Sequence, residues 1–381
     1  MKKIYLDYAA ATPMSPEAEA AMRTYLSDKF YNPSATYLSA RTARKDLDEI
    51  RARVALQLGA KPAEIVFTAG ATEANNLAVQ GVMRQYPDGE VLVSAVEHES
   101  VLAPAGLFKA NQAPVDQHGR IILNKLSNLI SDKTVLVSVM LVNNELGTIQ
   151  PLREIAVLVQ DIHADRLARG NQTPLYLHTD AAQAGNYLDL HASRLGVDLM
   201  SINGSKLYGP KQSGILFVKA GVKLLPLLYG GGQEFGLRSG TENIAAAAGL
   251  ATALELSAKT RKDELDRITS LRNLFELETQ QQIPNAQING GRHRAPHIIS
   301  LTIPGVDNER LMMELDEAGI ECAVGSACSA GSDEPSHVLA AIGLNDDLIR
   351  STLRFSLGRQ TSETDIRTTV KKLAALTDAN R

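Results

Sequence analysis

Short apolar runs alternate with amphipathic stretches through the first two thirds of this chain. The runs have the length and composition of buried strands and lie at 64–68, 91–95, 135–140, 175–179, 197–202 and 215–218. Helical spacing of apolar residues occurs between or before them, at 37–58, 72–84, 99–111 and 153–169. This alternation predicts an α/β fold with a mostly parallel sheet between helices. The link before 215–218 is too short for a helical crossover, so we expect that strand to run antiparallel.

A long helical stretch at 242–282 separates this region from the last third of the chain. Beyond it, strands are predicted at 297–303, 320–323 and 352–356, and helices at 307–318, 335–341 and 362–377. The long stretch is therefore the expected link to a second domain.

Composition limits the class of protein. With 381 residues, 44% of them hydrophobic and 22% charged, the chain has the make-up of a soluble globular protein. Its net charge of -4 lacks the basic excess of a nucleic-acid or membrane-surface binder, so neither kind of partner is expected. No apolar signal segment opens the chain, and no run reaches the roughly 20 apolar residues that span a bilayer. We expect a cytoplasmic protein.

Lys206 is the first candidate for chemistry. It follows the apolar run 197–202, sits among small residues and precedes the break at Gly209-Pro210. Burial disfavours an ammonium group, so we expect its pKa to fall until the amine is a nucleophile that can form a Schiff base. The alternative is a surface lysine in a turn. The residues predicted to lie near Lys206 distinguish these two interpretations.

Asp180 ends the run 175–179, and Gln183 follows one turn later. If the runs before Asp180 and Lys206 are parallel neighbours, both side chains emerge at the carboxyl edge of one sheet, where open α/β folds bind ligands. A carboxylate facing a pyridinium nitrogen, together with a lysine amine, is what pyridoxal 5'-phosphate (PLP) requires of a protein.

The segment 68–73 joins a predicted strand to a helix start and contains Gly70, Ala71 and Thr72. Small residues let backbone N–H groups approach an anion there, and the Thr72 hydroxyl adds a donor, so the segment predicts a phosphate-binding turn. The alternative is an ordinary tight turn with Thr72 as the helix cap.

Two more strand ends carry polar groups. His98 follows the run 91–95, where an imidazole could stack on a pyridine ring and move protons near neutral pH; the alternative is a structural histidine. Asn143 and Asn144 follow the run 135–140 and precede Gly147, where amides often only cap backbone groups. A single site at the sheet edge accounts for the polar groups on all of these loops.

Cys322 and Cys328 are the two cysteines of the chain, too few for a disulfide framework and not spaced like a zinc or thioredoxin-type pair. Cys328 lies in a run of small residues at 324–332 that is too small to pack, so its thiol could reach a site and leave again. The alternative is an incidental exposed cysteine. Cys322 lies between apolar neighbours and is expected in the core.

Taken together, these residues resemble the cysteine desulfurases of the NifS/IscS kind, which are fold-type I PLP enzymes of the class V aminotransferase group. The resemblance runs from the segment 5–10 to the segment 351–359, and the loop at 325–328 is similar to that of the group I members. It implies a large PLP-binding domain over residues 15–259 with a seven-stranded sheet. It also implies a smaller α/β domain, made of residues 1–14 and 260–381, that carries the Cys328 loop.

The resemblance implies a set of cofactor-binding residues. Lys206 would hold PLP as a Schiff base, Asp180 would face the pyridine nitrogen, and His98 would stack on the ring as acid and base. Gln183 and Asn144 would contact the phenolic oxygen. Around the phosphate it places Ala71, Thr72, Asn203, Ser205 and, from the partner subunit of a homodimer, Thr241.

The resemblance also implies the reaction. Arg354 would bind the α-carboxylate of L-cysteine, with Asn144 beside it, and Cys328 would attack the substrate sulfur, leaving L-alanine and a persulfide. A sulfur-acceptor protein would receive that sulfur for iron–sulfur clusters, thio-cofactors or tRNA. The alternatives are an aminotransferase or selenocysteine lyase of the same fold, or a catalytically silent sulfur-carrier scaffold.

The chain departs from the family pattern at two places. Asn203-Gly204-Ser205-Lys206 stands where the family has Ser-Gly-His-Lys or Ser-Ala-His-Lys. Asn203 and Ser205 still offer hydrogen bonds, but one potentially cationic phosphate ligand is missing. The tail after Arg359 is short, and in the family that region helps to dock a scaffold protein.

Overall fold

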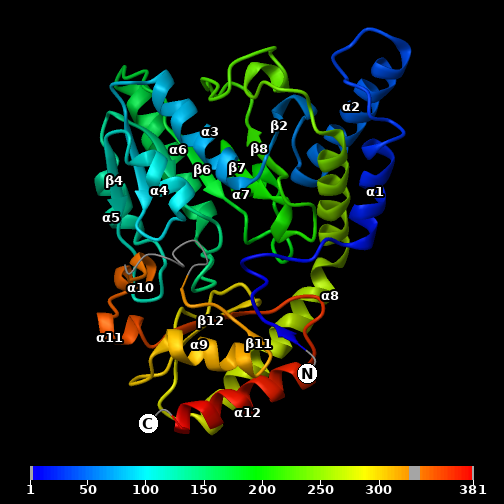
Figure 1. The fold of residues 1–381 in the computed structure, drawn as a ribbon. Helices are drawn as coiled ribbons and strands as arrows, with labels where there is room; N and C mark the ends of the chain where they lie inside the picture. The colour runs from blue at the N-terminus through cyan, green and yellow to red at the C-terminus, as the bar shows by residue number, and fades with distance from the viewer. Residues whose placement is uncertain (1–2, 326–334, 380–381) are drawn as a thin grey trace.

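A seven-stranded sheet forms the centre of the upper part of the molecule in Figure 1, a computed structural model that describes residues 3–325 and 335–379. Its strands are β2 (Ile65–Thr68), β3 (Glu90–Ser94), β4 (Ala110–Ala113), β5 (Thr134–Ser138), β6 (Tyr176–Asp180), β7 (Leu199–Asn203) and β8 (Gly214–Val218). Their order is β2-β8-β7-β6-β5-β3-β4, and only β8 runs against its neighbours. The predicted mostly parallel α/β sheet and its antiparallel strand at 215–218 are confirmed.

The helices of this part carry clear start and stop signals. Ser15 caps α1 by accepting a hydrogen bond from the Ala18 N–H, with Pro16 in the first position. Gly59 ends α2 in the left-handed region at φ 58°. The helices are α1 (Pro16–Leu26), α2 (Leu38–Leu58), α3 (Ala71–Gln85), α4 (Glu99–Ala105), α5 (Leu123–Leu129), α6 (Leu152–Ala168) and α7 (Ala192–Leu195).

One predicted helix was wrong in its extent. The helix expected at 99–111 is α4, which ends at Ala105, and the chain then forms β4 at the sheet edge. Pro104 lies inside the short helix and Gly106 follows it, which favours a stop there. Three of the four β4 residues are exposed, so no apolar run marks this strand in the sequence.

The lower part of the molecule contains the chain's end and its beginning. Its elements are α8 (Ile244–Gln282), β9 (Gln287–Ile288), β10 (Ile298–Thr302), α9 (Asn308–Glu317), β11 (Ile320–Glu321), α10 (His337–Ala341), α11 (Asp346–Ile349), β12 (Thr352–Ser356) and α12 (Glu363–Ala379). Strands β12, β10 and β9 form an antiparallel sheet, and β1 (Ile4–Tyr5) pairs in parallel with β11. Figure 1 accordingly shows the N-terminal strand beside the C-terminal elements.

Helix α8 runs through both parts of the molecule (Figure 1). Its first half, including Ala247, Leu250 and Leu254, packs into the apolar core beside the large sheet. Its second half, including Ile268 and Phe275, packs into a separate core that also contains residues of β1, β10 and β12. The helix therefore fixes the small sheet relative to the large one.

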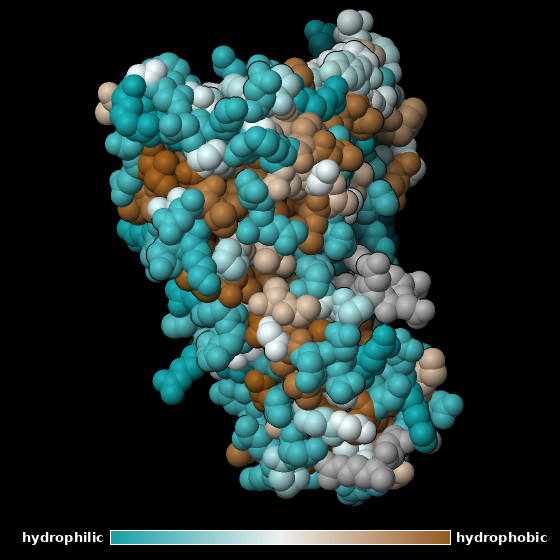
Figure 2. Space-filling model, turned by 90° about the vertical axis from the view of Figure 1, so that its left-hand side faces the viewer, coloured by the Kyte–Doolittle hydropathy of each residue, from teal (hydrophilic) through white to brown (hydrophobic). Residues whose placement is uncertain are grey.

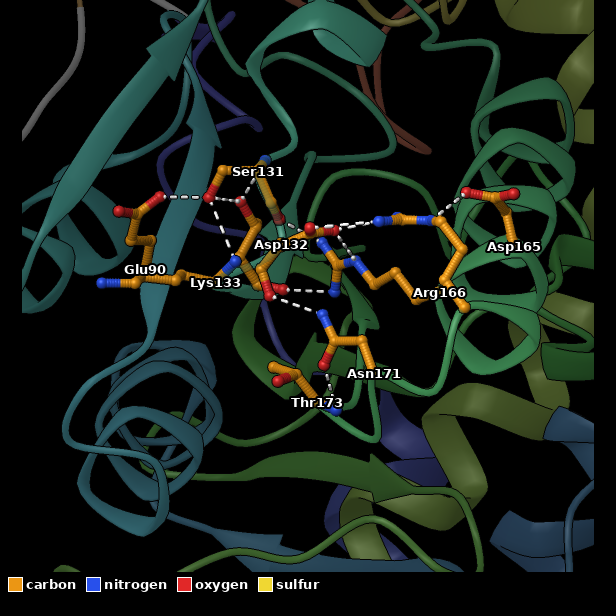
Figure 3. A network of polar contacts seen from close by, with 10 residues as sticks. Glu90, Ser131, Asp132, Lys133, Asp165, Arg166, Asn171 and Thr173 are labelled. Atoms are coloured by element: carbon orange, nitrogen blue, oxygen red, sulfur yellow. Dashed lines mark hydrogen bonds and ion pairs between the residues drawn. The ribbon is translucent and has the colours of Figure 1, made fainter.

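A buried arginine fastens α6 to the start of β5. The Arg166 side chain is fully buried, and its guanidinium donates to the backbone carbonyls of Thr134, at 2.8 Å, and of Ser131. Figure 3 shows this turn together with the surrounding acidic and amide side chains. These contacts tie helix α6 to the residues at the start of β5.

The surface mixes both kinds of residue. On the side of the molecule that Figure 2 shows, hydrophilic residues cover most of the area, and apolar residues gather in patches on its upper half. Within residues 3–325 and 335–379, no helix is both long and apolar enough to cross a membrane.

Candidate active site

A pocket of about 210 Å³ lies where the loops after β2, β3, β5, β6 and β7 meet β12. It is lined by Ala9, Ala10, Ala71, Thr72, His98, Ser100, Met140, Val142, Asn144, Asp180, Ala182, Gln183, Asn203, Lys206 and Arg354. The carboxyl ends of parallel strands share one sheet edge, and this brings the side chains together. Nine of the residues singled out from the sequence therefore line one pocket, although residues 71 and 354 lie far apart in the chain.

Asp180 ends β6 inside this pocket, and its side chain is buried. One carboxylate oxygen, Oδ1, accepts a hydrogen bond from the Ala182 N–H at 2.8 Å. The other, Oδ2, accepts one from the amide of Asn75 at 2.7 Å. Strand β6 pairs in parallel with β7, with Asp180 opposite Ser201, so Asp180 and the lysine turn occupy neighbouring strand ends.

Lys206 ends a single 3-10 turn at Gly204–Lys206 that follows β7. Asn203 caps the turn by accepting from the Ser205 N–H at 3.2 Å and from the Ser205 hydroxyl at 3.1 Å. Gly204 is required because a Cβ there would lie 2.1 Å from the Ser213 hydroxyl oxygen. The Lys206 amine donates to the carbonyl of Ala10.

A strap at residues 9–15 holds the lysine turn from the N-terminal side. The Thr12 hydroxyl donates to the Ser205 carbonyl at 2.9 Å and accepts from the Tyr208 N–H at 2.8 Å. Tyr208 has φ 61°, in the left-handed region that a residue with a side chain rarely adopts. The Ser15 N–H also donates to the Tyr208 carbonyl. These bonds fix a strained turn directly after the lysine.

His98 caps helix α4 with its own ring. Its Nδ1 lies 3.0 Å from the Ser100 backbone nitrogen, which donates to it, and 2.8 Å from the Ser100 hydroxyl. The ring thus has a fixed orientation at the wall of the pocket. Both Ser100 and Asn75 contribute to this arrangement, and sequence reasoning missed both, because a polar residue on a helix is ordinarily exposed.

The first turn of α3 offers backbone donors to the pocket. Gly70 is its N-cap, with φ 136°, and no side chain in the described part of the chain caps the helix. Thr72 therefore is not the cap, the alternative considered from the sequence; it lies within the first turn and lines the pocket with Ala71. Uncapped N–H groups at a helix start favour an anion. Ser205 does not line the pocket, and its hydroxyl is turned toward Asn203.

Arg354 on β12 supplies a buried positive charge. Its NH2 group donates to Asp7 Oδ1 at 2.7 Å, and its NH1 group donates to the Asn144 carbonyl at 3.1 Å. Its Nε is buried without a hydrogen-bond partner among the described residues. A buried guanidinium N–H in this state is suited to an anionic ligand.

The two amides predicted to contact a cofactor oxygen differ in their surroundings. Gln183 donates from Nε2 to the Ala9 carbonyl at 2.9 Å, and its Oε1 lies 3.3 Å from His297 Nε2. Burial, with a smaller effect of Arg354, lowers the pKa of His297 to about 3, so that ring is neutral. Asn144 lines the pocket, whereas the capping role expected of such amides belongs to Asn143, whose Oδ1 accepts from the backbone N–H groups of Glu145 and Leu146.

Of the predicted site residues, Ser205 and Thr241 lie outside this pocket, and Cys328 cannot be placed. Thr241 is exposed and lines a different hollow of about 330 Å³, beside Thr68 and Ala69. Cys328 lies outside the described residues. Cys322 packs against the small-sheet core as expected, and burial raises the pKa of its thiol to about 12, with a further contribution from Asp7.

The sequence model described as aminotransferase class-V matches residues 4–368. The chain belongs to the class V aminotransferase family. A family relative from Dictyoglomus turgidum, named cysteine desulfurase IscS, is 37% identical over 388 residues, which cover 100% of this chain and 96% of that relative. Among solved structures, a NifS-like protein has a TM-score of 0.90 at 28% identity and covers 99% of this chain and 100% of its own. A structure of SspA in complex with cysteine has a TM-score of 0.78 at 33% identity, covering 93% and 98%.

The fold of this class V aminotransferase is that of the NifS-like, fold-type I PLP enzymes, as the sequence predicted. Enzymes of the family depend on PLP. The polar residues of the pocket lie on the loops of the large sheet and on one strand of the small sheet, so the pocket uses both parts of the chain.

Proposed function

We propose that this class V aminotransferase is a PLP-dependent cysteine desulfurase, which converts L-cysteine to L-alanine and transfers the sulfur to Cys328. The observation that carries the proposal is the single pocket that gathers Lys206, Asp180, His98 and Arg354 at the carboxyl edge of the sheet. The relatives named cysteine desulfurase, which match over the whole chain, support the choice of substrate.

The groups in the pocket fit PLP. Lys206 offers an amine for the cofactor's aldehyde carbon, and Asp180 offers a carboxylate for a protonated ring nitrogen. The uncapped first turn of α3 and the Thr72 hydroxyl suit a phosphate, with the Asn203 amide at the same wall. When bound, PLP supplies an electron sink that weakens bonds at the α- and β-carbons of an amino acid.

The chain's own residues bind the substrate, move its protons and accept its sulfur. Arg354 binds the substrate carboxylate with its buried guanidinium, and Asn144 lies beside it. Lys206 Nζ, held near the Ala10 carbonyl, takes and returns the proton of the α-carbon. The Cys328 thiolate attacks the substrate sulfur, so that an S–S bond forms as the Cβ–S bond breaks. The electron pair of the broken bond stays with the β-carbon, which takes up a proton and becomes the methyl group of L-alanine. A sulfur-acceptor protein then removes the persulfide sulfur for iron–sulfur cluster or thio-cofactor and tRNA synthesis.

We also infer that the enzyme works as a homodimer in which Thr241 completes the partner's phosphate site. Thr241 is exposed and does not line the pocket of its own chain, which supports this arrangement. Large apolar side chains such as Phe30, Leu38 and Tyr229 are also exposed, as expected of surfaces that a second copy covers. The mass of the assembly in solution checks the inference.

The experiment that tests the proposed function measures alanine and sulfide formed from L-cysteine by PLP-loaded protein with a thiol reductant present. Cys328→Ser should keep the visible absorbance of the bound cofactor but lose sulfide formation by about a hundredfold or more, because the covalent nucleophile is gone. Cys322→Ser is the matched control and should stay active, since the half-buried Cys322 thiol is held protonated by its raised pKa.

Three outcomes would contradict the proposal. A Cys328→Ser variant with undiminished turnover would remove the role of that thiol. A keto acid in place of alanine would indicate an aminotransferase. A colourless protein that binds no added PLP would indicate a silent scaffold.

A further inference from the structure

Two buried side chains connect the carboxylate of the pocket to its imidazole. Asn75 lies on α3 and is fully buried; its Nδ2 is 2.7 Å from Asp180 Oδ2 and 2.8 Å from the Ser100 hydroxyl oxygen. Ser100 lies in the first turn of α4, with its hydroxyl 2.8 Å from His98 Nδ1. Three hydrogen bonds in series therefore join Asp180 to His98.

The chemistry of the groups gives this series a direction. A carboxylate oxygen only accepts hydrogen bonds, so Asn75 must turn its NH2 group, and not its carbonyl, toward Asp180. The same NH2 group then donates its second proton to Ser100, whose oxygen becomes an acceptor. The hydroxyl proton of Ser100 is left to point at His98 Nδ1. Asn75 Oδ1 is buried with no partner among the described residues, consistent with an orientation set by its NH2 group alone.

The backbone of α4 reinforces this direction. The Ser100 N–H, which can only donate, points at His98 Nδ1 from 3.0 Å. Two donors thus converge on one ring nitrogen, and a proton on Nδ1 would face both of them. Neutral imidazole carries a single proton, so it must be on Nε2.

We propose that Asn75 and Ser100 are positioning residues that hold His98 as the Nε2–H tautomer, so that His98 presents a hydrogen-bond donor to the ligand of the pocket. The consequence of this tautomer for catalysis rests on the proposed function. The proton removed from the substrate's α-carbon goes to Lys206, the other nitrogen base that lines the pocket.

The direct test is an NMR spectrum that correlates 1H and 15N nuclei through two-bond couplings, recorded on the PLP-loaded protein labelled with 15N in its histidine rings. His98→Asn removes one set of signals and so assigns it. We expect the Nδ1 resonance of His98 at the position of an unprotonated nitrogen and its Nε2 resonance at that of a protonated one. The opposite pattern, or an imidazolium pattern at neutral pH, overturns the proposal. This test needs no substitution at Asn75 or Ser100.

A pair of variants at position 100 tests the hydroxyl. Ser100→Ala removes one of the two donors found at His98 Nδ1 among the described residues and keeps the backbone N–H, so the Nδ1 resonance should shift toward the protonated position. Ser100→Thr keeps a hydroxyl on the same carbon and should leave the spectrum unchanged. Equal spectra for the alanine variant and the wild type would show that the hydroxyl does not set the tautomer.

Asn75→Asp tests whether Asn75 sets the direction of these hydrogen bonds. It replaces the donating NH2 by an oxygen that accepts the Ser100 hydroxyl proton, so the Ser100 lone pair faces His98 Nδ1. The Nδ1 resonance should then move further toward the protonated position than in Ser100→Ala. An unchanged spectrum in folded Asn75→Asp would overturn the role of Asn75.

These spectra also separate this inference from the proposed function. A wild-type protein with the Nε2–H pattern that forms no alanine would refute the function and leave the tautomer assignment intact. A protein that forms alanine while His98 carries its proton on Nδ1 would refute the inference alone.

Discussion

At the scale of single residues, the pocket depends on groups whose burial could not be foreseen. Lys206, Asp180 and His98 each follow an apolar run, and that position in the sequence was enough to predict a shared sheet edge. Asn75 stands in a helix and has no such marker, yet it is fully buried. Glu97 is likewise fully buried; its Oε1 accepts the Met140 N–H at 2.6 Å and its Oε2 has no partner among the described residues.

Glu97 should make stability depend on pH in an unusual direction. Burial, with a smaller effect of the nearby Asp180 charge, raises the pKa of Glu97 well above its ordinary value. The folded protein therefore keeps a proton that the unfolded chain loses, and this costs stability as pH rises from the unfolded pKa, by at most about 1.4 kcal/mol per pH unit. Glu97→Gln removes this dependence while preserving an acceptor for Met140.

Urea unfolding of the wild type and Glu97→Gln, in the same cofactor state, measures the effect. As the pH rises from about 5 to about 8, the free energy of unfolding of the variant should increase relative to that of the wild type. An equal difference in the free energy of unfolding at both pH values would show that Glu97 is ionised in the folded protein.

At the scale of elements, the lysine turn is a strained segment held by a distant one. Hydrophobic patterning predicted β7 and the break after it, because an apolar run ended in small residues. It could not predict that the strap at residues 9–15 crosses the turn, since contacts between positions 12 and 208 depend on the complete fold. The same limit explains the missed edge strand β4, whose pairing with β3 compensates for a sequence without an apolar run.

Thr12→Val tests the strap. Valine keeps the shape of threonine but removes both bonds of the hydroxyl, and the buried Tyr208 N–H loses its acceptor. We expect a loss of about 1–3 kcal/mol in the free energy of unfolding, together with weaker retention of PLP. Thr12→Ser keeps the hydroxyl and should retain most of both. A valine variant with wild-type stability and PLP occupancy would contradict the role of the strap.

At the scale of the whole molecule, one pocket draws on two cores. The large-sheet loops supply Lys206, Asp180 and His98, and β12 of the small sheet supplies Arg354, while α8 packs into both cores. The alternation of strands and helices was enough to predict the fold class. The meeting of the two parts came from the resemblance to a family, because periodicity describes each element and not how distant elements dock.

The central claim is that this pocket holds PLP through Lys206. The most direct measurement treats the PLP-loaded protein with borohydride, which fixes a lysine-bound cofactor, and locates the adduct by peptide mass spectrometry. The account predicts the adduct on Lys206 and none on Lys211, an exposed lysine five positions later. An adduct on another lysine, or an unlabelled Lys206 in protein that has bound PLP, would contradict it.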